Sequence, residues 1–217
     1  TTEHLMTKYI QASFFDNKVL PLLSFLYTDT MYGQNFDYYR IKDILDQYDP
    51  KQIECKQWVV DELLPFINKE DEIAVIGGWY GLMSHMLAEC LDNTIMDYEL
   101  DAICIELHYR LKVHDSIMIE LKDGFEIFDD KDLNGKDKVI ICTACEHIDE
   151  EDLYGALSMK NPHSLVVLQS NNMSHIDSHV NCHPSLDNFI ESLPDMEILY
   201  KGTKSFDDYE RYMVIAK

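Results

Sequence analysis

Basic residues are scarce in this chain. Its 217 residues include 18 Lys and Arg against 40 Asp and Glu, which gives a formal net charge of −22 at pH 7. No run of Lys or Arg occurs that would form a local basic patch. A polyanion such as DNA or RNA would be repelled over most of such a surface. We therefore expect no nucleic-acid partner.

Long apolar runs and a disulfide pattern are also missing. No run of about 18 apolar residues occurs, so we expect no membrane span, and no signal peptide is recognisable. The six cysteines are scattered, mostly in apolar runs, which is typical of reduced thiols in a cytoplasmic protein. Cys142 and Cys145 form C-T-A-C without a second pair, so neither a zinc nor a redox site is predicted there. Length and a 46% hydrophobic content fit one soluble globular domain.

Short apolar runs alternate with amphipathic stretches from residue 72 onward. This pattern predicts a parallel sheet covered on both faces, a doubly wound α/β fold. The last two strands, "MEILYKG" and "YERYMVIAK", alternate and predict an antiparallel C-terminal hairpin, which makes seven strands. Residues 1–68 show helical periodicity in places and are predicted to form a helical N-terminal cap. The other expected strands are Ile73–Ile76, Thr94–Met96, Ser116–Leu121, Val139–Cys142 and Leu165–Gln169; the expected helices are Leu82–Leu91, Asp101–Lys112, Phe125–Leu133 and Glu150–Met159.

Glycine is rare too, yet three of the eight glycines stand together in "EIAVIGGWYGLMSHML". This stretch predicts a turn between the first strand and its helix, where ligands bind in such sheets. Glycine there lets the backbone approach a ligand and permits positive φ. Asp97 follows Gly77 by 20 residues, at the place where an acid accepts hydrogen bonds from ribose hydroxyls, and Glu99 is a second acid two positions on. The pattern favours a nucleoside ligand; the alternative is a tight turn with Trp79 packed in the core.

A further motif follows the fourth predicted strand. In "VIICTACEHIDEEDLYGAL" that strand leads into Cys145-Glu146-His147-Ile148 and an acidic helix start. Together with "IGGWYG" and Asp97, this arrangement resembles the class I S-adenosylmethionine-dependent methyltransferases, and also uncharacterised methyltransferase-like proteins of phages and bacteria. The resemblance covers about residues 70–217 and implies a Rossmann-like domain, from residue 69, that binds S-adenosyl-L-methionine. A nicotinamide dehydrogenase is less favoured, because Ile76 stands where the first glycine of the dinucleotide motif would fall.

The resemblance also implies roles for individual residues. The glycine turn would hold the methionine part of the cofactor, Asp97 the ribose and Asp123 the adenine amino group, although Asp123-Gly124 is also a common turn pair. Glu146 and His147 would border the sulfonium as catalytic residues. His147 is the candidate base, since histidine titrates near pH ~6.5; the alternative is that it only orients the next helix. The implied cofactor contacts are Ile76, Gly77, Gly78, Trp79, Gly81, Asp97, Asp123 and Thr143.

The acceptor is expected to meet the polar stretch "QSNNMSHIDSHVNCHP" after the fifth strand. Its candidate substrate-binding residues, with Tyr32 from the N-terminal region as part of a lid, are Asn171, Asn172, His175 and His179. The tyrosines of that region can also be explained by packing alone. Histidines recur every four residues here, a metal spacing on a helix, but Pro184 ends the run. An acceptor-lining loop is preferred, and no metal site is predicted.

These observations favour a cytoplasmic methyltransferase that acts on a small molecule or a peptide side chain. The Asn/Asp-Pro-Pro-aromatic signature of amino-methyltransferases is missing after the fourth strand, which argues against DNA bases. Two alternatives remain open. One is aminocarboxypropyl transfer or lysis, which releases methylthioadenosine. The other is S-adenosylmethionine binding without catalysis.

Overall fold

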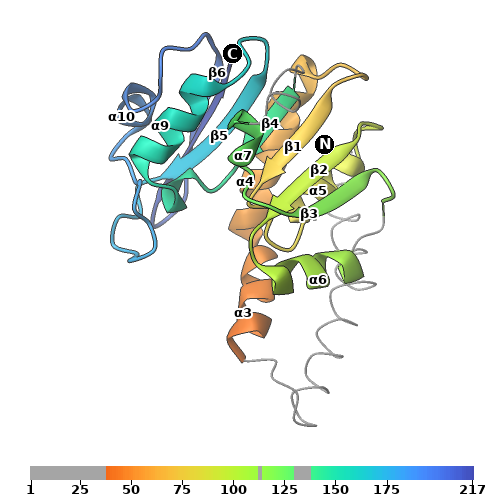
Figure 1. Ribbon diagram of the computed structural model, residues 1–217. Coiled ribbons are helices and arrows are strands. Elements are labelled where there is room, and N and C mark those ends of the chain that lie inside the picture. The colour runs from red at the N-terminus through yellow and green to blue at the C-terminus, as the bar shows by residue number, and fades with distance from the viewer. Residues whose placement is uncertain (1–37, 112–113, 130–137) are drawn as a thin grey trace, which may run out of the picture.

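The protein contains a seven-stranded mixed sheet, seen in a computed structural model that describes residues 38–111, 114–129 and 138–217 (Figure 1). The strand order is β3-β2-β1-β4-β5-β7-β6. The first five strands are parallel, and β7 runs antiparallel to both β5 and β6. The strands are β1 (Glu72–Ile76), β2 (Ile95–Glu99), β3 (Ile117–Leu121), β4 (Lys138–Cys142), β5 (Leu165–Asn171), β6 (Ile198–Ser205) and β7 (Glu210–Ala216).

Helices cover both faces of this sheet because its central strands β1, β4 and β5 are buried on both sides. In β1, Ala74 and Ile76 face one layer, and Ile73 and Val75 face the other. The first layer holds α7 (Glu126–Asp129), α9 (Glu150–Met159) and α10 (Leu186–Glu191). The second holds α4 (Pro50–Leu63), α5 (Leu82–Ala88) and α6 (Ala102–Leu111). The remaining elements are α3 (Tyr38–Gln47) and the 3₁₀ turns η2 (Leu64–Phe66) and η3 (Cys145–His147). The predicted doubly wound fold with an antiparallel C-terminal hairpin is confirmed.

The ends of the elements differ from the prediction in one place that matters for the site. Strand β2 continues to Glu99, three residues beyond the predicted end at Met96. Asp97 is therefore an interior strand residue, in register with Val75 of β1. The residue at the carboxyl end of β2 is Glu99.

Helix α4, which belongs to the predicted N-terminal cap, is part of the packed core. Asp49 caps its start by accepting a hydrogen bond from the Lys51 N–H, and Pro50 occupies the first turn. Val59 and Leu63 are fully buried against the sheet, and the Trp58 Nε1–H donates to the Tyr200 hydroxyl at 2.9 Å. Helix α4 of the predicted cap is thus part of a covering layer of the sheet. Residues 1–37, including Tyr32, lie outside the described residues, so the lid stays a prediction.

No helix among the described residues is long and apolar enough to cross a bilayer.

Candidate functional site

A cavity of about 740 Å³ opens at the carboxyl ends of strands β1 to β4. This is the edge of a parallel sheet at which ligands bind. Its walls come from the glycine turn, the end of β2, the segment after β3, the segment after β4 and helix α9. The lining residues are Ile76, Gly77, Tyr98, Glu99, Leu100, Lys122, Asp123, Gly124, Phe125, Glu126, Cys142, Ala144, His147, Ile148, Asp149, Glu151, Asp152, Gly155, Ala156 and Met159.

The glycine turn approaches this cavity through Gly77. Its φ is +64°, and a Cβ added there would meet no atom within 4 Å, so the backbone faces open space. The Gly77 N–H donates to the Tyr98 carbonyl at 2.9 Å, which ties the turn to the end of β2. Trp79 also has a positive φ, +56°, a conformation that is costly for a bulky side chain. Its N–H donates to Glu99 Oε2 at 2.9 Å, which helps to hold the turn in this shape.

The other two glycines of the turn face the protein interior. A Cβ on Gly78 would lie 1.8 Å from Asp97 Oδ1, and one on Gly81 would lie 2.0 Å from His108 Nε2. These glycines let the turn lie directly on buried polar side chains. Neither lines the cavity, and neither does Trp79. Of the predicted turn contacts, the structure therefore places only Ile76 and Gly77 at the cavity.

Asp97 does not reach the cavity. It is fully buried beneath α5 and α6, where the Ser84 hydroxyl donates to its carboxylate and His108 Nδ1 lies 3.7 Å away. Burial is the main cause that raises its pKa to about 7, so near neutral pH it is partly protonated. The structure therefore does not place Asp97 on the cavity wall, where the ribose contact was expected. Asp97 lies in the interior of β2, covered by α5 and α6, and the strand ends two residues later at Glu99.

Glu99 occupies the position that Asp97 was expected to fill. It lines the cavity, and besides the Trp79 N–H its carboxylate accepts from the Leu100 N–H at 2.8 Å and the Asp101 N–H at 3.0 Å. A carboxylate has about four acceptor positions, so three backbone donors orient it and one position remains for a ligand. Asp123 lines the cavity from the segment after β3, where it caps its own turn by accepting from the Phe125 N–H at 2.9 Å.

Substituting Gly78 tests this packing. We expect Gly78→Ala to destabilise the fold by about 3 kcal/mol, the upper range for overpacking, because the new Cβ meets the buried Asp97 carboxylate. Urea unfolding measures the change. Gly155→Ala in α9 is the matched control, since a Cβ there meets nothing within 4 Å and alanine favours a helix. Equal stability of the Gly78 variant and the wild type would contradict the assigned packing.

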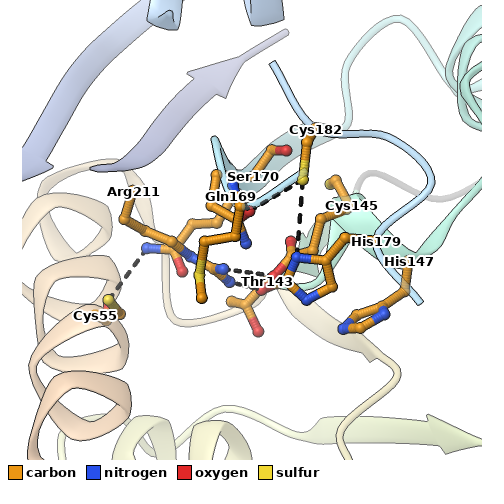
Figure 2. A network of polar contacts seen from close by, with 12 residues as sticks. Cys55, Thr143, Cys145, His147, Gln169, Ser170, His179, Cys182 and Arg211 are labelled. Carbon is orange, nitrogen blue, oxygen red and sulfur yellow. Dashed lines mark hydrogen bonds and ion pairs between the residues drawn. The ribbon is translucent and has the colours of Figure 1, made fainter. Parts of the chain in front are cut away.

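The two predicted catalytic residues in the segment after β4 face different surroundings. His147 is exposed and lines the cavity. Glu146 is buried and turned toward β7, where Arg211 Nη1 donates to its Oε1 at 2.5 Å. Arg211 Nη2 donates to the Thr143 carbonyl (Figure 2). Glu146 and Thr143 do not line the cavity. Arg211, which pairs with Glu146, stands 65 residues away in the chain, and no local pattern in the sequence indicated it.

The loop between β5 and α10 lies against this segment. It consists of turns and bends, so the helical arrangement of its histidines, which was the less favoured alternative, does not form. Backbone bonds from Asn181 N–H to the Glu146 carbonyl (3.1 Å) and from His183 N–H to the Asn171 carbonyl (3.0 Å) fix its path. The His179 ring meets the His147 ring edge-on, with 4.6 Å between centroids (Figure 2).

The predicted substrate residues in this loop are not part of the cavity wall. Asn171 is buried, and its Oδ1 accepts from the Met173 N–H and the Cys182 thiol. Asn172 Oδ1 accepts from the Glu210 N–H. These two amides shape the loop. His175 is exposed, and His179 is the loop residue that the structure brings beside His147.

The comparisons with known proteins find similarity to solved structures but not to known sequences. No protein-family model matches the sequence, and no curated protein sequence matches it. Solved structures do match. A methyltransferase from Anabaena variabilis has 16% identity and a TM-score of 0.58, over 73% of this chain and 83% of that one. Magnesium protoporphyrin IX methyltransferase from Synechocystis, with bound S-adenosylmethionine, has 15% identity and a TM-score of 0.57 over 97% of both chains.

The fold is that of S-adenosylmethionine-dependent methyltransferases. Geranyl diphosphate C-methyltransferase from Streptomyces coelicolor, with 12% identity and a TM-score of 0.58 over 85% of this chain and 84% of that one, shares it as well. The acceptors that these proteins are named for, a porphyrin and an isoprenoid diphosphate, have little in common chemically. The methyltransferase fold alone thus does not specify an acceptor.

Proposed function

We propose that this protein is an S-adenosylmethionine-dependent methyltransferase that acts on a small molecule or a peptide side chain. The observation that carries the proposal is the cavity at the carboxyl edge of the sheet, with Gly77, Glu99 and Asp123 on its wall, in a chain with the methyltransferase fold. Its volume of about 740 Å³ lies in the usual range of small-ligand sites.

The residues on the wall can hold each part of the cofactor. Glu99 offers its remaining acceptor position to the ribose hydroxyls, and Asp123 takes the adenine amino group at the turn after β3. The Gly77 backbone, unobstructed by a side chain, lies along the methionine part. Acidic residues on the α9 side, Asp149, Glu151 and Asp152, add negative potential that favours a cationic sulfonium.

Methyl transfer from a sulfonium is an in-line displacement, so the protein must hold the acceptor behind the methyl group. His147 borders the cavity next to the β5–α10 loop, and we place the acceptor there. A neutral His147 is able to remove a proton from the acceptor. Glu146, held by Arg211, acts on this region by fixing the backbone around His147.

The same cavity would serve the alternative chemistries, because only the position of the attacking group differs. Attack on the methyl carbon leaves S-adenosylhomocysteine, whereas attack on the aminobutyrate carbon leaves methylthioadenosine. Mass spectrometry of the nucleoside product after incubation with S-adenosylmethionine and an acceptor panel separates them. Tight binding with no product of either kind would instead indicate a binding protein.

Glu99→Gln tests the cofactor site directly. We expect S-adenosylmethionine affinity to fall by ~1–3 kcal/mol in calorimetry, because a charged acceptor is lost while the shape is kept. Glu70→Gln removes an equal charge from an exposed site before β1, at the opposite sheet edge, and should bind as the wild type does. Unchanged affinity in a folded Glu99 variant would remove Glu99 from the site.

A further inference from the structure

Three side chains with metal-binding atoms converge where the β4 segment meets the β5–α10 loop. Glu146, His147 and His179 each offer one such atom, and these atoms lie within 4.8 Å of one another. Pairing of β4 with β5 brings the two segments to one edge, and the bond from Asn181 N–H to the Glu146 carbonyl holds them together.

The carboxylate of the cluster has a free metal-binding oxygen. Glu146 is only 4% exposed, and its Oε2 has no hydrogen-bond partner among the described residues, although Arg211 engages Oε1. An unpaired carboxylate oxygen is costly to bury, so it needs an explanation. A bound cation at Oε2 supplies one, while Arg211 orients the carboxylate from behind.

The two histidines are oriented in the way that metal-binding imidazoles are. His147 Nδ1 lies 3.0 Å from the Ser178 carbonyl, which can only accept, so Nδ1 carries the proton and Nε2 keeps its lone pair. His179 Nδ1 lies 3.7 Å from Cys182 Sγ, and the ring also has a backbone hydrogen bond with Met173, so the loop holds this ring in place as well. Imidazoles that bind metals usually donate their other N–H to a backbone carbonyl or a similar group.

We propose that Glu146, His147 and His179 bind one divalent transition metal beside the cofactor cavity, with open positions for an oxygen of the acceptor. Two imidazoles and one carboxylate form a ligand set that suits such metals. Ligand atoms about 2.1 Å from a metal lie roughly 3.4 Å apart in a tetrahedral site. The exposed and half-buried histidine rings therefore close by at most about 1.5 Å on binding.

The role of this metal rests on the proposed methyltransferase function. His147 borders both the metal site and the cavity, so an acceptor on the metal lies next to the methyl group. With its Nε2 on the metal, His147 does not itself take the proton; instead a hydroxyl bound to the metal releases its proton to solvent more readily. Its oxygen then forms the bond to the methyl carbon, and the electrons of the breaking C–S bond pass to sulfur. The metal and the adjacent Arg211 make this site locally positive, although the protein as a whole is acidic. Such a site favours an acceptor that becomes an oxyanion.

Titration of untagged, reduced protein with Co²⁺, followed by visible absorption without S-adenosylmethionine, tests the site. We expect one Co²⁺ per chain, and at least about tenfold weaker binding in His179→Gln and in His147→Gln. His163→Gln, an exposed histidine before β5, should bind as the wild type does. Circular dichroism confirms that each variant is folded.

Equal Co²⁺ affinity in all four proteins would overturn the metal site, as would thiolate charge-transfer absorption showing cysteine ligands. The cofactor is titrated separately in the presence of a chelator. S-adenosylmethionine binding there, without site-specific Co²⁺ binding, refutes the metal site alone. Failure of S-adenosylmethionine to bind refutes the proposed function while the metal titration still stands.

Discussion

Replacement of Arg211 by Met is expected to lower the free energy of unfolding by about 3–5 kcal/mol. Arg211 and Glu146 are 5% and 4% exposed, and their contact joins the start of β7 to the turn after β4. A buried carboxylate without its counter-charge loses both the attraction and its hydration. Urea unfolding in the presence of a chelator measures this loss without interference from bound metal.

Two further variants isolate the cause. Lys201→Met breaks a surface contact with Asp187, 3.8 Å long with both side chains more than half exposed, and should change stability by less than about 1 kcal/mol. The double variant Arg211→Met/Glu146→Gln removes the orphaned charge and should be more stable than Arg211→Met alone. A loss in Arg211→Met no greater than in Lys201→Met would show that the buried pair contributes little.

The second large effect concerns turnover. His147→Gln is expected to reduce turnover ~10²–10⁴-fold, the usual contribution of a group that handles the reacting proton. Cofactor affinity should stay close to that of the wild type, because Glu99 and Asp123 approach the cavity from other strands. His147 is exposed, so its substitution should leave the melting temperature nearly unchanged.

Three measurements on the same variant decide between the roles of His147. Turnover is followed as release of S-adenosylhomocysteine with an acceptor that the wild type uses, and affinity and melting temperature are measured alongside. His163→Gln serves as control, since this exposed residue before β5 lies at the opposite sheet edge. Normal turnover in His147→Gln would leave catalysis to acceptor positioning alone. A lower melting temperature with full turnover would assign His147 a structural role.

Much of the fold could be predicted from the sequence because its causes are local. Apolar runs such as Val139–Cys142 are buried on both faces. The need to bury apolar side chains on both faces by itself implies helices on both sides of a parallel sheet. The glycine turn was likewise predictable, because glycine has no Cβ and readily adopts the positive φ seen at Gly77 and Gly81. His147 at the cavity followed from its place after β4.

Only the tertiary structure decided which polar side chains face the cavity. Strand β2 runs three residues past its predicted end, to Glu99. Asp97 therefore lies inside the strand and is buried, whereas Glu99, on the same face at the strand end, lines the cavity. The partner of Glu146 depends on β7 lying antiparallel beside β5, and His179 meets His147 because two loops far apart in the chain share one sheet edge. By itself the sequence determined where apolar surface must be buried. The contacts of Glu146 and His179 required the folded chain, because they join segments whose distance along the chain says nothing about their distance in space.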